Sequence, residues 1–196
     1  SLGNYFFYGV SCTDIKLADS IESIGGYAFS GAQIEHIKLP DKLKYINNDA
    51  FYFCDNLKEI VFPKSISSIG TSAFENCSVL SKVSFEAMGN ELTISSRAFF
   101  KCPLLKRVDV PSLAKLSKYS FGYEKASVDG TYDGFTLGVY SGSKAYNYAQ
   151  SSFINYELLN EIAIEEGDVA SRTYTEDNLS EQTVYKFTPN SSSQYT

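Results

Sequence analysis

Histidine and paired cysteines, from which many catalytic and metal sites are built, are scarce in this sequence. The one histidine, His36, lies between Glu35 and Ile37, where we predict an outward strand position. A Ser-His-Asp or Cys-His site would have to use this single imidazole. No His-Glu-x-x-His motif, EF-hand loop, phosphate-binding loop or dinucleotide fingerprint is present. We therefore predict no enzyme, no cofactor and no metal site, and keep an unrecognised hydrolase as the least favoured alternative.

The four cysteines show no Cys-x-x-Cys pair, and their spacings of 42, 23 and 25 residues do not resemble a disulfide framework or a zinc site. Three of them, Cys54, Cys77 and Cys102, follow an Ala-Phe dipeptide at the same distance. Ala32 and Val10 occupy that place elsewhere. A position shared by Cys, Ala and Val is typical of a small buried apolar site, so we predict free structural thiols.

Positive charge and long apolar runs are also lacking. The net charge is −6, and residues 160–196 hold seven acidic and only two basic residues. Non-specific nucleic-acid binding relies on a basic excess, so a nucleic-acid partner is not expected. No stretch approaches the 18 apolar residues of a spanning helix, so we expect no membrane insertion. The chain starts with Ser and shows no signal peptide, which we interpret as a mature or excised piece.

What the sequence does contain is an internal repeat. Phenylalanines recur at intervals of 22, 22, 23, 25 and 22 residues, and they are Phe7, Phe29, Phe51, Phe74, Phe99 and Phe121. The full unit has the form Ala-Phe-x-x-Cys-x-x-Leu-x-x-Ile-x-Phe-Pro-x-x-Ile-x-x-Ile-Gly. A period of 20 to 50 residues indicates a solenoid or a related array.

The spacing within one unit predicts a coil that turns once per unit. The Ile-x-Phe pair places two side chains on one face of a short strand, and proline ends that strand because it has no N–H to donate. The later Ile-x-x-Ile-Gly segment predicts a return strand, with Leu113 and Leu116 inward in the fifth unit, and a tight turn in which glycine tolerates positive φ. One unit cannot bury its apolar face alone, so we expect stacked units with a continuous phenylalanine ladder.

These residues carry a family resemblance. The phrase Ile-Gly-x-x-Ala-Phe-x-x-Cys-x-x-Leu-x-x-Ile-x-Phe-Pro resembles the BspA-like leucine-rich repeats of the Treponema pallidum type, whose units have about 22–23 residues. The resemblance covers residues 1–122, about five units, and it implies a right-handed solenoid of short β-strands and turns with little helix. The resemblance also implies a secreted or cell-surface bacterial protein. Some relatives adhere to host matrix proteins.

The period stops after residue 122. In residues 123–159 we predict strands near 134–140 and 153–159 around a short helix that begins after the N-cap Ser143. We interpret this region as a C-terminal capping unit, because a solenoid must cover its last apolar turn. Residues 160–196 are predicted to be a β-rich tail, such as the opening hairpin of a further domain or a segment lying against the cap.

Function is then left to the variable outward positions. On the predicted strand these positions form columns across the units, and the central column is Asp14, His36, Glu59, Lys82 and Arg107. Opposite charges across strands support a sheet, which is the structural interpretation. The functional interpretation is a flat binding face for a protein or a glycan. Aromatic loops around Tyr52, Phe53 and Tyr123 are the alternative contact surface for the same ligand. The competing hypothesis is a passive spacer that presents a neighbouring domain.

Overall fold

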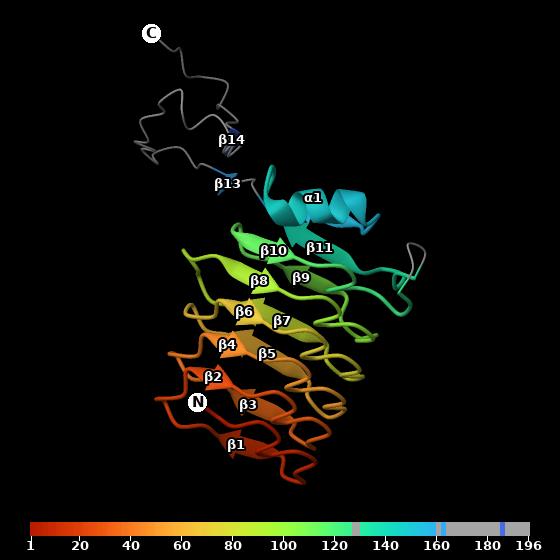
Figure 1. Ribbon diagram of the computed structural model, residues 1–196. Helices are drawn as coiled ribbons and strands as arrows, with labels where there is room; N and C mark the ends of the chain where they lie inside the picture. The colour runs from red at the N-terminus through yellow and green to blue at the C-terminus, as the bar shows by residue number, and fades with distance from the viewer. Residues whose placement is uncertain (127–129, 160–161, 164–184, 187–196) are drawn as a thin grey trace.

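The computed structural model describes residues 1–126, 130–159, 162–163 and 185–186 (Figure 1). The chain winds into a solenoid of about six turns, each made by one unit of the repeat and called a rung below. Two rows of short parallel strands and one row of turns run along its length. The expected solenoid of short strands with little helix is confirmed, while its handedness stays a prediction.

Two opposite faces of the solenoid are built from strands. The strand face consists of β1 (Asp14–Lys16), β3 (His36–Lys38), β5 (Glu59–Phe62), β7 (Lys82–Phe85), β9 (Arg107–Asp109), β11 (Thr136–Val139) and β12 (Tyr156–Leu158). The return face consists of β2 (Ser23–Ile24), β4 (Tyr45–Ile46), β6 (Ser68–Ile69), β8 (Leu92–Ile94) and β10 (Ala114–Leu116). The return face is one five-stranded parallel sheet, whereas the strand face is divided into the hydrogen-bonded groups β1–β3, β5–β7 and β9–β11–β12.

The predicted phenylalanine ladder forms the core. Successive ring centroids from Phe7 to Phe121 are 4.6–5.2 Å apart, and their planes are within 19° of parallel. Beyond the half-buried Phe7, every ring of the ladder is at most 1% exposed. Burying each such side chain contributes roughly 1.5–3 kcal/mol of transfer free energy, so this ladder is a main source of stability. The spacing of the rings matches the separation of adjacent strands, so one phenylalanine ring per rung fills the interior of the coil.

The three cysteines after the Ala-Phe dipeptide are buried free thiols, as predicted. Each Sγ donates to the phenylalanine carbonyl of the preceding rung, at 3.1 Å for Cys54 and 3.2 Å for Cys77 and Cys102. Burial raises the pKa of Cys54 and Cys102 to about 12. An unfolded thiol titrates near pH 8.5, so the stability linked to these sites is complete below that pH and is lost as the pH rises towards 12.

The glycine of the Ile-Gly turn has a different role from the expected one. Gly25 and Gly70 do not have positive φ. A Cβ on Gly70 would lie 2.6 Å from the carbonyl carbon of Asn47 and the backbone nitrogen of Asn48 in the preceding rung. Glycine is therefore needed for close approach between rungs, and the prediction of positive φ was wrong.

Positive φ occurs instead at two other positions of the turn. One lies just before the Ala of Ala-Phe and the other just before the Cys, and φ lies between 53° and 69° at both. The first position holds Tyr5, Tyr27, Asp49, Ser72, Arg97 and Tyr119, and the second holds Gly9, Gly31, Phe53, Asn76 and Lys101. Side chains other than glycine are disfavoured there, so most rungs accept local backbone strain.

The return strands change spacing along the solenoid. In β4 and β6, the inward isoleucine comes three positions after another inward apolar residue. In β8 and β10, inward and outward side chains alternate instead, so inward positions are two residues apart. Ala114 pairs with Leu92 and is buried, whereas Leu113 is 44% exposed. The prediction that Leu113 points inward was wrong, because the regular strand β10 shifts the inward position by one residue. The extra residues of the fourth unit leave the coil as a loop between Phe85 and Leu92.

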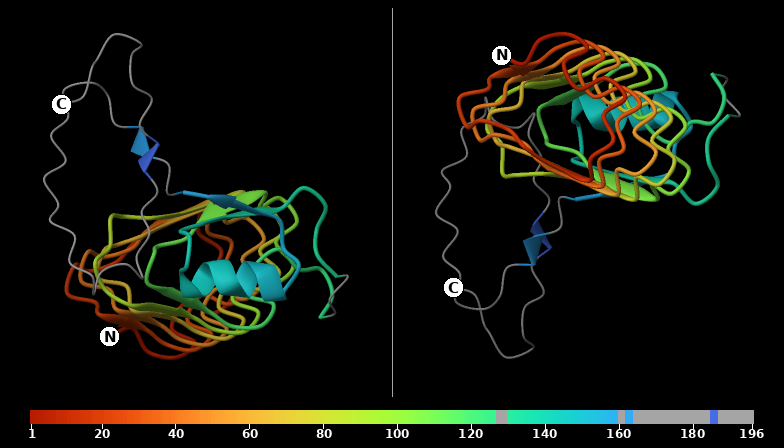
Figure 2. Two further views of the ribbon diagram at one scale, coloured as in Figure 1. Left: turned by 90° about the horizontal axis from the view of Figure 1, so that it is seen from above. Right: turned by 90° about the horizontal axis from the view of Figure 1, so that it is seen from below.

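After the repeats, the helix α1 (Lys144–Ser151) lies across the end of the coil, as the axial view of Figure 2 shows. Ser143 is its N-cap, and its hydroxyl accepts from the N–H of Tyr146, as predicted. Ala145 and Ala149 are buried, and α1 contacts β10 and β11. The strands β13 (Ile162–Ala163) and β14 (Tyr185–Lys186) pair in parallel, so the expected antiparallel hairpin is wrong for these four residues. The rest of the predicted tail lies outside the described residues.

Candidate binding surface

The central column of the strand face lies where the sequence predicted it. Asp14 pairs with His36 across β1 and β3, and Glu59 pairs with Lys82 across β5 and β7. Arg107 begins β9, and all five side chains are exposed. The strand residues next to each member of the column point inward and fill the core. Since side chains alternate along a strand, the members of the column must point towards solvent.

Several of these charges are satisfied within the chain. The Nζ of Lys82 lies 3.4 Å from Glu59, and Arg107 is paired with both Asp109 and Glu157. The hydrogen bond that Arg107 donates to Glu157 is the main cause that raises the pKa of Arg107. Asp14 accepts a hydrogen bond from the hydroxyl of Thr13. Ion pairs so exposed contribute little stability, but they show that the column serves in part to align the rungs.

Similar pairs connect rungs elsewhere on both faces. Lys58 lies 2.5 Å from Glu35, Lys44 lies 2.9 Å from Glu22, and Lys115 lies 2.6 Å from Glu91. In each case the hydrogen bond that the lysine donates lowers the pKa of the carboxyl group. Each partner lies one rung away. Neighbouring units are therefore linked by opposite charges.

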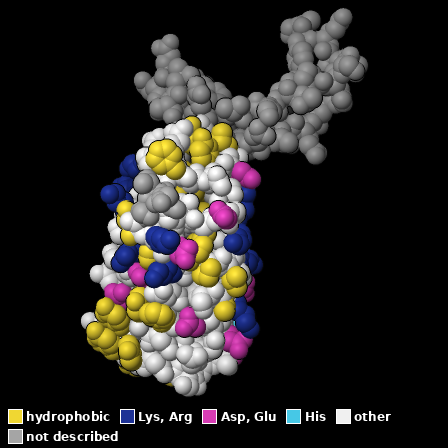
Figure 3. All heavy atoms as spheres, turned by 90° about the vertical axis from the view of Figure 1, so that its right-hand side faces the viewer, with side chains coloured by type: hydrophobic (Ala, Val, Ile, Leu, Met, Phe, Trp, Pro, Cys, Tyr) yellow, Lys and Arg dark blue, Asp and Glu magenta, His cyan; other side chains and the backbone are white. Residues whose placement is uncertain are grey.

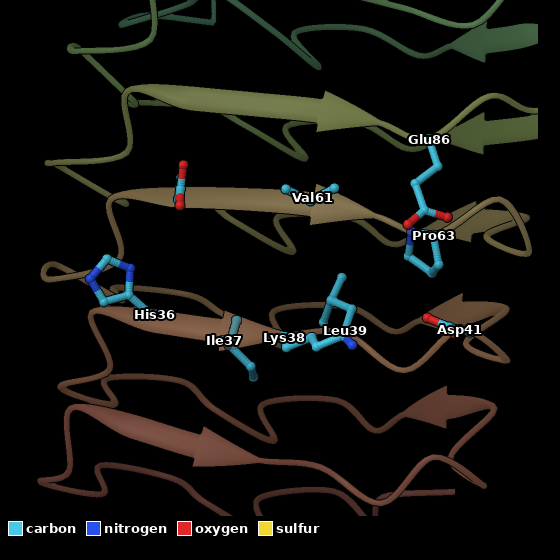
Figure 4. Close-up of a pocket in the computed structure, with 9 residues that line it drawn as sticks. His36, Ile37, Lys38, Leu39, Asp41, Val61, Pro63 and Glu86 are labelled. Atoms are coloured by element: carbon cyan, nitrogen blue, oxygen red, sulfur yellow. The ribbon is translucent and has the colours of Figure 1, made fainter.

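A shallow hollow of about 300 Å³ lies on the strand face where β3 meets β5, at a break between two hydrogen-bonded groups (Figure 4). His36 lies at one end of the hollow, and Asp41 and Glu86 lie at the other, with Val61 and Leu39 between them. The charged residues that line it are Lys38, Asp41, Glu59 and Glu86, so carboxylates outnumber ammonium groups. An apolar floor with an acidic rim suits a cation on an aliphatic stem.

Sequence reasoning found two members of this hollow, His36 and Glu59, and missed the rest. The available signal was Val61, which occupies an outward position where two other rungs carry Lys16 and Lys38. Val61 is 46% exposed, and because its side chain is shorter than that of lysine, the surface is depressed at that point. A second hollow of about 320 Å³ lies where β7 meets β9, at the other break in the strand face.

The aromatic loops proposed as an alternative surface divide into two cases. Phe53 is 45% exposed, and its ring meets that of the half-buried Tyr52 edge to face at 4.6 Å. Tyr123 is only 2% exposed, and its hydroxyl donates to the carbonyl of Ser152 at 3.0 Å. The prediction that Tyr123 takes part in a contact loop was wrong, because the segment after α1 covers it.

Two general features complete the description of the surface. Within residues 1–126 and 130–159 and the two short strands that follow, no group of three or more His, Cys, Asp and Glu side chains is placed to hold a metal ion. In the same part of the chain, no helix has the length and apolar character needed to cross a membrane.

Comparison with known proteins places this geometry in context. The crystal structure of the pneumococcal vaccine antigen PcpA is 32% identical over 53% of this chain and 26% of its own, with a TM-score of 0.49. A leucine-rich repeat protein from Eubacterium ventriosum is 21% identical over 82% of this chain and 46% of its own, also with a TM-score of 0.49. This chain therefore spans less than half the length of either structure. No curated protein matches the sequence.

The family model for the BspA type leucine rich repeat region matches six copies over residues 1–127. This is one copy more than the roughly five units expected over residues 1–122. The match covers more than half of the chain and accounts for the rungs, the turns and the phenylalanine ladder described above. The chain therefore belongs to the BspA-type leucine-rich repeat family.

Proposed function

We propose that this chain is a non-enzymatic recognition module of a secreted or cell-surface bacterial protein, and that it binds a protein partner through its strand face. Family membership supports the general role, because solenoids use their extended surfaces for binding. A role in adhesion follows if the partner is a host protein. The partner contacts the central column and the hollow between β3 and β5.

The observation that carries this proposal is the hollow itself. Its lining includes Ile37, Val61 and Pro63, and the carboxylates of Asp41 and Glu86 lie at one end. Glu59 is already paired with Lys82, but no ion pair of Asp41 or Glu86 is found among the described residues. A lysine or arginine side chain would lay its methylene groups on the floor and its charge beside these carboxylates. The partner is therefore a protein that presents a basic anchor residue.

One observation favours the spacer hypothesis as a second candidate. Glu59, Lys82 and Arg107 find partners within the chain, so three of the five members of the central column do not need an external ligand. A spacer would show no preference for basic peptides and no dependence on the residues of the hollow. The two candidates therefore differ in one measurable property.

That property can be tested by selecting a displayed random-peptide library on the immobilised chain and on the variant Asp41→Lys/Glu86→Lys. We expect the original chain to enrich peptides that contain a lysine or arginine beside apolar residues. The selected peptides should lose about tenfold or more in affinity for the variant, because a charge pair becomes a repulsion.

The matched control is Glu22→Lys/Glu91→Lys, which makes the same change of charge outside the strand face, at residues that flank the return face. The control should bind the selected peptides like the original chain. Equal binding to the hollow variant and to the control would contradict recognition through the strand face. Failure to enrich any basic peptide would favour the spacer.

A further inference from the structure

The row of Ala-Phe turns forms a third side of the solenoid, called the turn edge below, and its cations differ from those of the two faces. Lys44, Lys58 and Lys115 are each paired with a carboxylate of a neighbouring rung. The turn edge presents Arg97, Lys101 and Lys118, and none of these three forms an ion pair with a described residue. All three are exposed, so their charges are available to a ligand.

Two of these cations lie against one aromatic ring, and the backbone of the third is bonded to the rung that carries them. The backbone N–H of Arg97 donates to the carbonyl of Lys118 in the next rung at 3.2 Å. The guanidinium carbon of Arg97 lies 4.7 Å from the ring centroid of Phe100, and the Nζ of Lys101 lies 5.8 Å from the same centroid. Phe100 therefore holds two cations at one point of the edge through cation–π contacts.

The same edge is aromatic at its N-terminal end. Tyr5, Phe6 and Tyr8 are 57–64% exposed, and Phe53 two rungs away is 45% exposed. Figure 3 shows this side of the molecule, with hydrophobic side chains gathered at its lower end and Lys and Arg side chains above them. Tyr5 stacks on Tyr27 of the next rung at 5.0 Å, so the aromatic surface has the period of the rungs.

Several exposed side chains of the turn edge also have an unusual backbone conformation. Tyr5, Phe53, Arg97 and Lys101 all have positive φ, although Gly9 and Gly31 show that glycine fits one of these positions. A bulky residue in this region costs free energy, and an exposed aromatic ring recovers little by packing. The buried Ser72 has the same conformation, so positive φ belongs to the turn of the repeat, and the charge and aromatic surface of the edge carry the argument.

We propose that the turn edge binds an acidic polysaccharide, a chain of sugars with carboxylate or sulfate groups, that lies along the solenoid axis. Arginine and lysine bind such anions through charge-assisted hydrogen bonds. The C–H faces of sugar rings stack on exposed tyrosine and phenylalanine rings, while hydroxyl groups bond to the tyrosine oxygen. The rungs repeat every 4.6–5.2 Å, which is comparable with the length of one sugar unit, so successive sugars meet successive rungs.

Two other polymers fit these observations less well. Duplex nucleic acid binds mainly through many phosphate contacts, whereas this chain has a net charge of −6 and three clustered cations. An extended peptide often adds to a free strand edge. The turn backbone has no such edge, because its N–H groups already donate to the next rung, as Phe51 does to Ala73 and Phe74 does to Ala98.

The test measures the affinity of the full chain for heparin, for hyaluronan and for neutral dextran at physiological salt. We expect binding to the two acidic polysaccharides and none to dextran. The variant Arg97→Ala/Lys101→Ala/Lys118→Ala should lose about tenfold or more in affinity for heparin, because these contacts are charge-assisted. The matched control Lys44→Ala/Lys58→Ala/Lys115→Ala removes the same charge from paired lysines and should change the affinity by less than about threefold.

A second variant tests the aromatic end without changing the charge. Tyr5→Ser/Tyr8→Ser/Phe53→Ser should weaken binding to hyaluronan severalfold, whereas Tyr45→Ser, at an exposed tyrosine of the return face, should not. Circular dichroism and thermal unfolding confirm that each variant is folded. The strand-face variant Asp41→Lys/Glu86→Lys should keep its affinity for the polysaccharides, so this proposal and the proposed function fail separately.

Three results would overturn the proposal. The first is no binding of heparin or hyaluronan by the original chain. The second is an equal loss in the turn-edge variant and the paired-lysine control, which would indicate bulk charge alone. The third is no effect of the aromatic variant on hyaluronan binding, which would indicate a general polyanion surface.

Discussion

Gly70 illustrates how single residues set the distance between rungs. Its missing side chain lets the chain approach the backbone of Asn47 and Asn48 closely, and a Cβ would meet those atoms at 2.6 Å. We predict that Gly70→Ala lowers the free energy of unfolding by about 1–3 kcal/mol, because backbone atoms on both sides must move. Urea-induced unfolding followed by circular dichroism measures this change.

The control for this prediction is Gly89→Ala. A Cβ on Gly89 meets no atom within 4 Å, and its φ is not positive, so the substitution should change stability by less than about 0.5 kcal/mol. If both substitutions cost the same, close approach between rungs is not what requires glycine at position 70.

At the scale of residues, the sequence predicted which side chains point inward but not why each turn has its shape. Phe51, Cys54 and Ile60 were placed in the core because their positions recur in every unit. The strained position before Ala escaped prediction because most of its residues, such as Tyr27 and Arg97, do not favour positive φ. At the position before Cys, Gly9, Gly31 and Asn76 do favour it, and this signal was missed. The ion-pair partners of Arg107 were also missed, because Glu157 lies fifty positions away and reaches Arg107 only after the chain has turned back.

The element that follows the repeats, α1, is expected to protect the last rung. Its buried face is formed by Ala145 and Ala149, and it contacts β10. We predict that Ala149→Glu lowers the free energy of unfolding by about 3–5 kcal/mol, because a carboxylate would be buried without a partner. Thermal and urea unfolding would show this loss, and proteolysis would show cleavage within residues 143–152.

Asn147→Glu is the matched control on the exposed side of the same helix. It introduces the same charge without burial, and we expect a change below about 0.5 kcal/mol. Equal effects of the two substitutions would show that α1 does not serve as a cap.

At the scale of elements, local signals were sufficient for α1 and insufficient for the strand face. The helix and its N-cap Ser143 were predicted because they depend on adjacent residues. The division of the strand face into three hydrogen-bonded groups depends on how neighbouring rungs pair, which the sequence of one unit does not specify. The hollow between β3 and β5 arises at one of these divisions, so its far end, with Asp41 and Glu86, was not predicted.

Considered as a whole, the molecule is a stack in which each rung contacts mainly its neighbours. We predict that deleting residues 47–69, one full unit, leaves a folded protein that is one rung shorter. The deletion joins Ile46 to Gly70, so Phe29 would stack on Phe74, and Cys77 would donate to the carbonyl of Phe29. Stability and the urea m-value should both fall, because less surface is buried on folding.

The comparison for this prediction is deletion of residues 47–58, about half a unit. This deletion puts the inward and outward positions out of register, so we expect loss of cooperative unfolding. If the full-unit deletion also fails to fold, rungs are not interchangeable and the whole array folds as one fixed assembly.

The parallel stacking of the rungs also has a mechanical consequence. The strands lie across the long axis, so a force along that axis loads the rungs in series, and the hydrogen bonds between two rungs open one after another rather than together. Each rung that detaches releases 22 to 25 residues, or about 70–90 Å of extended chain. Stretching therefore proceeds in even steps at low force, and the solenoid behaves as an extensible tether whose step length equals that of its repeat.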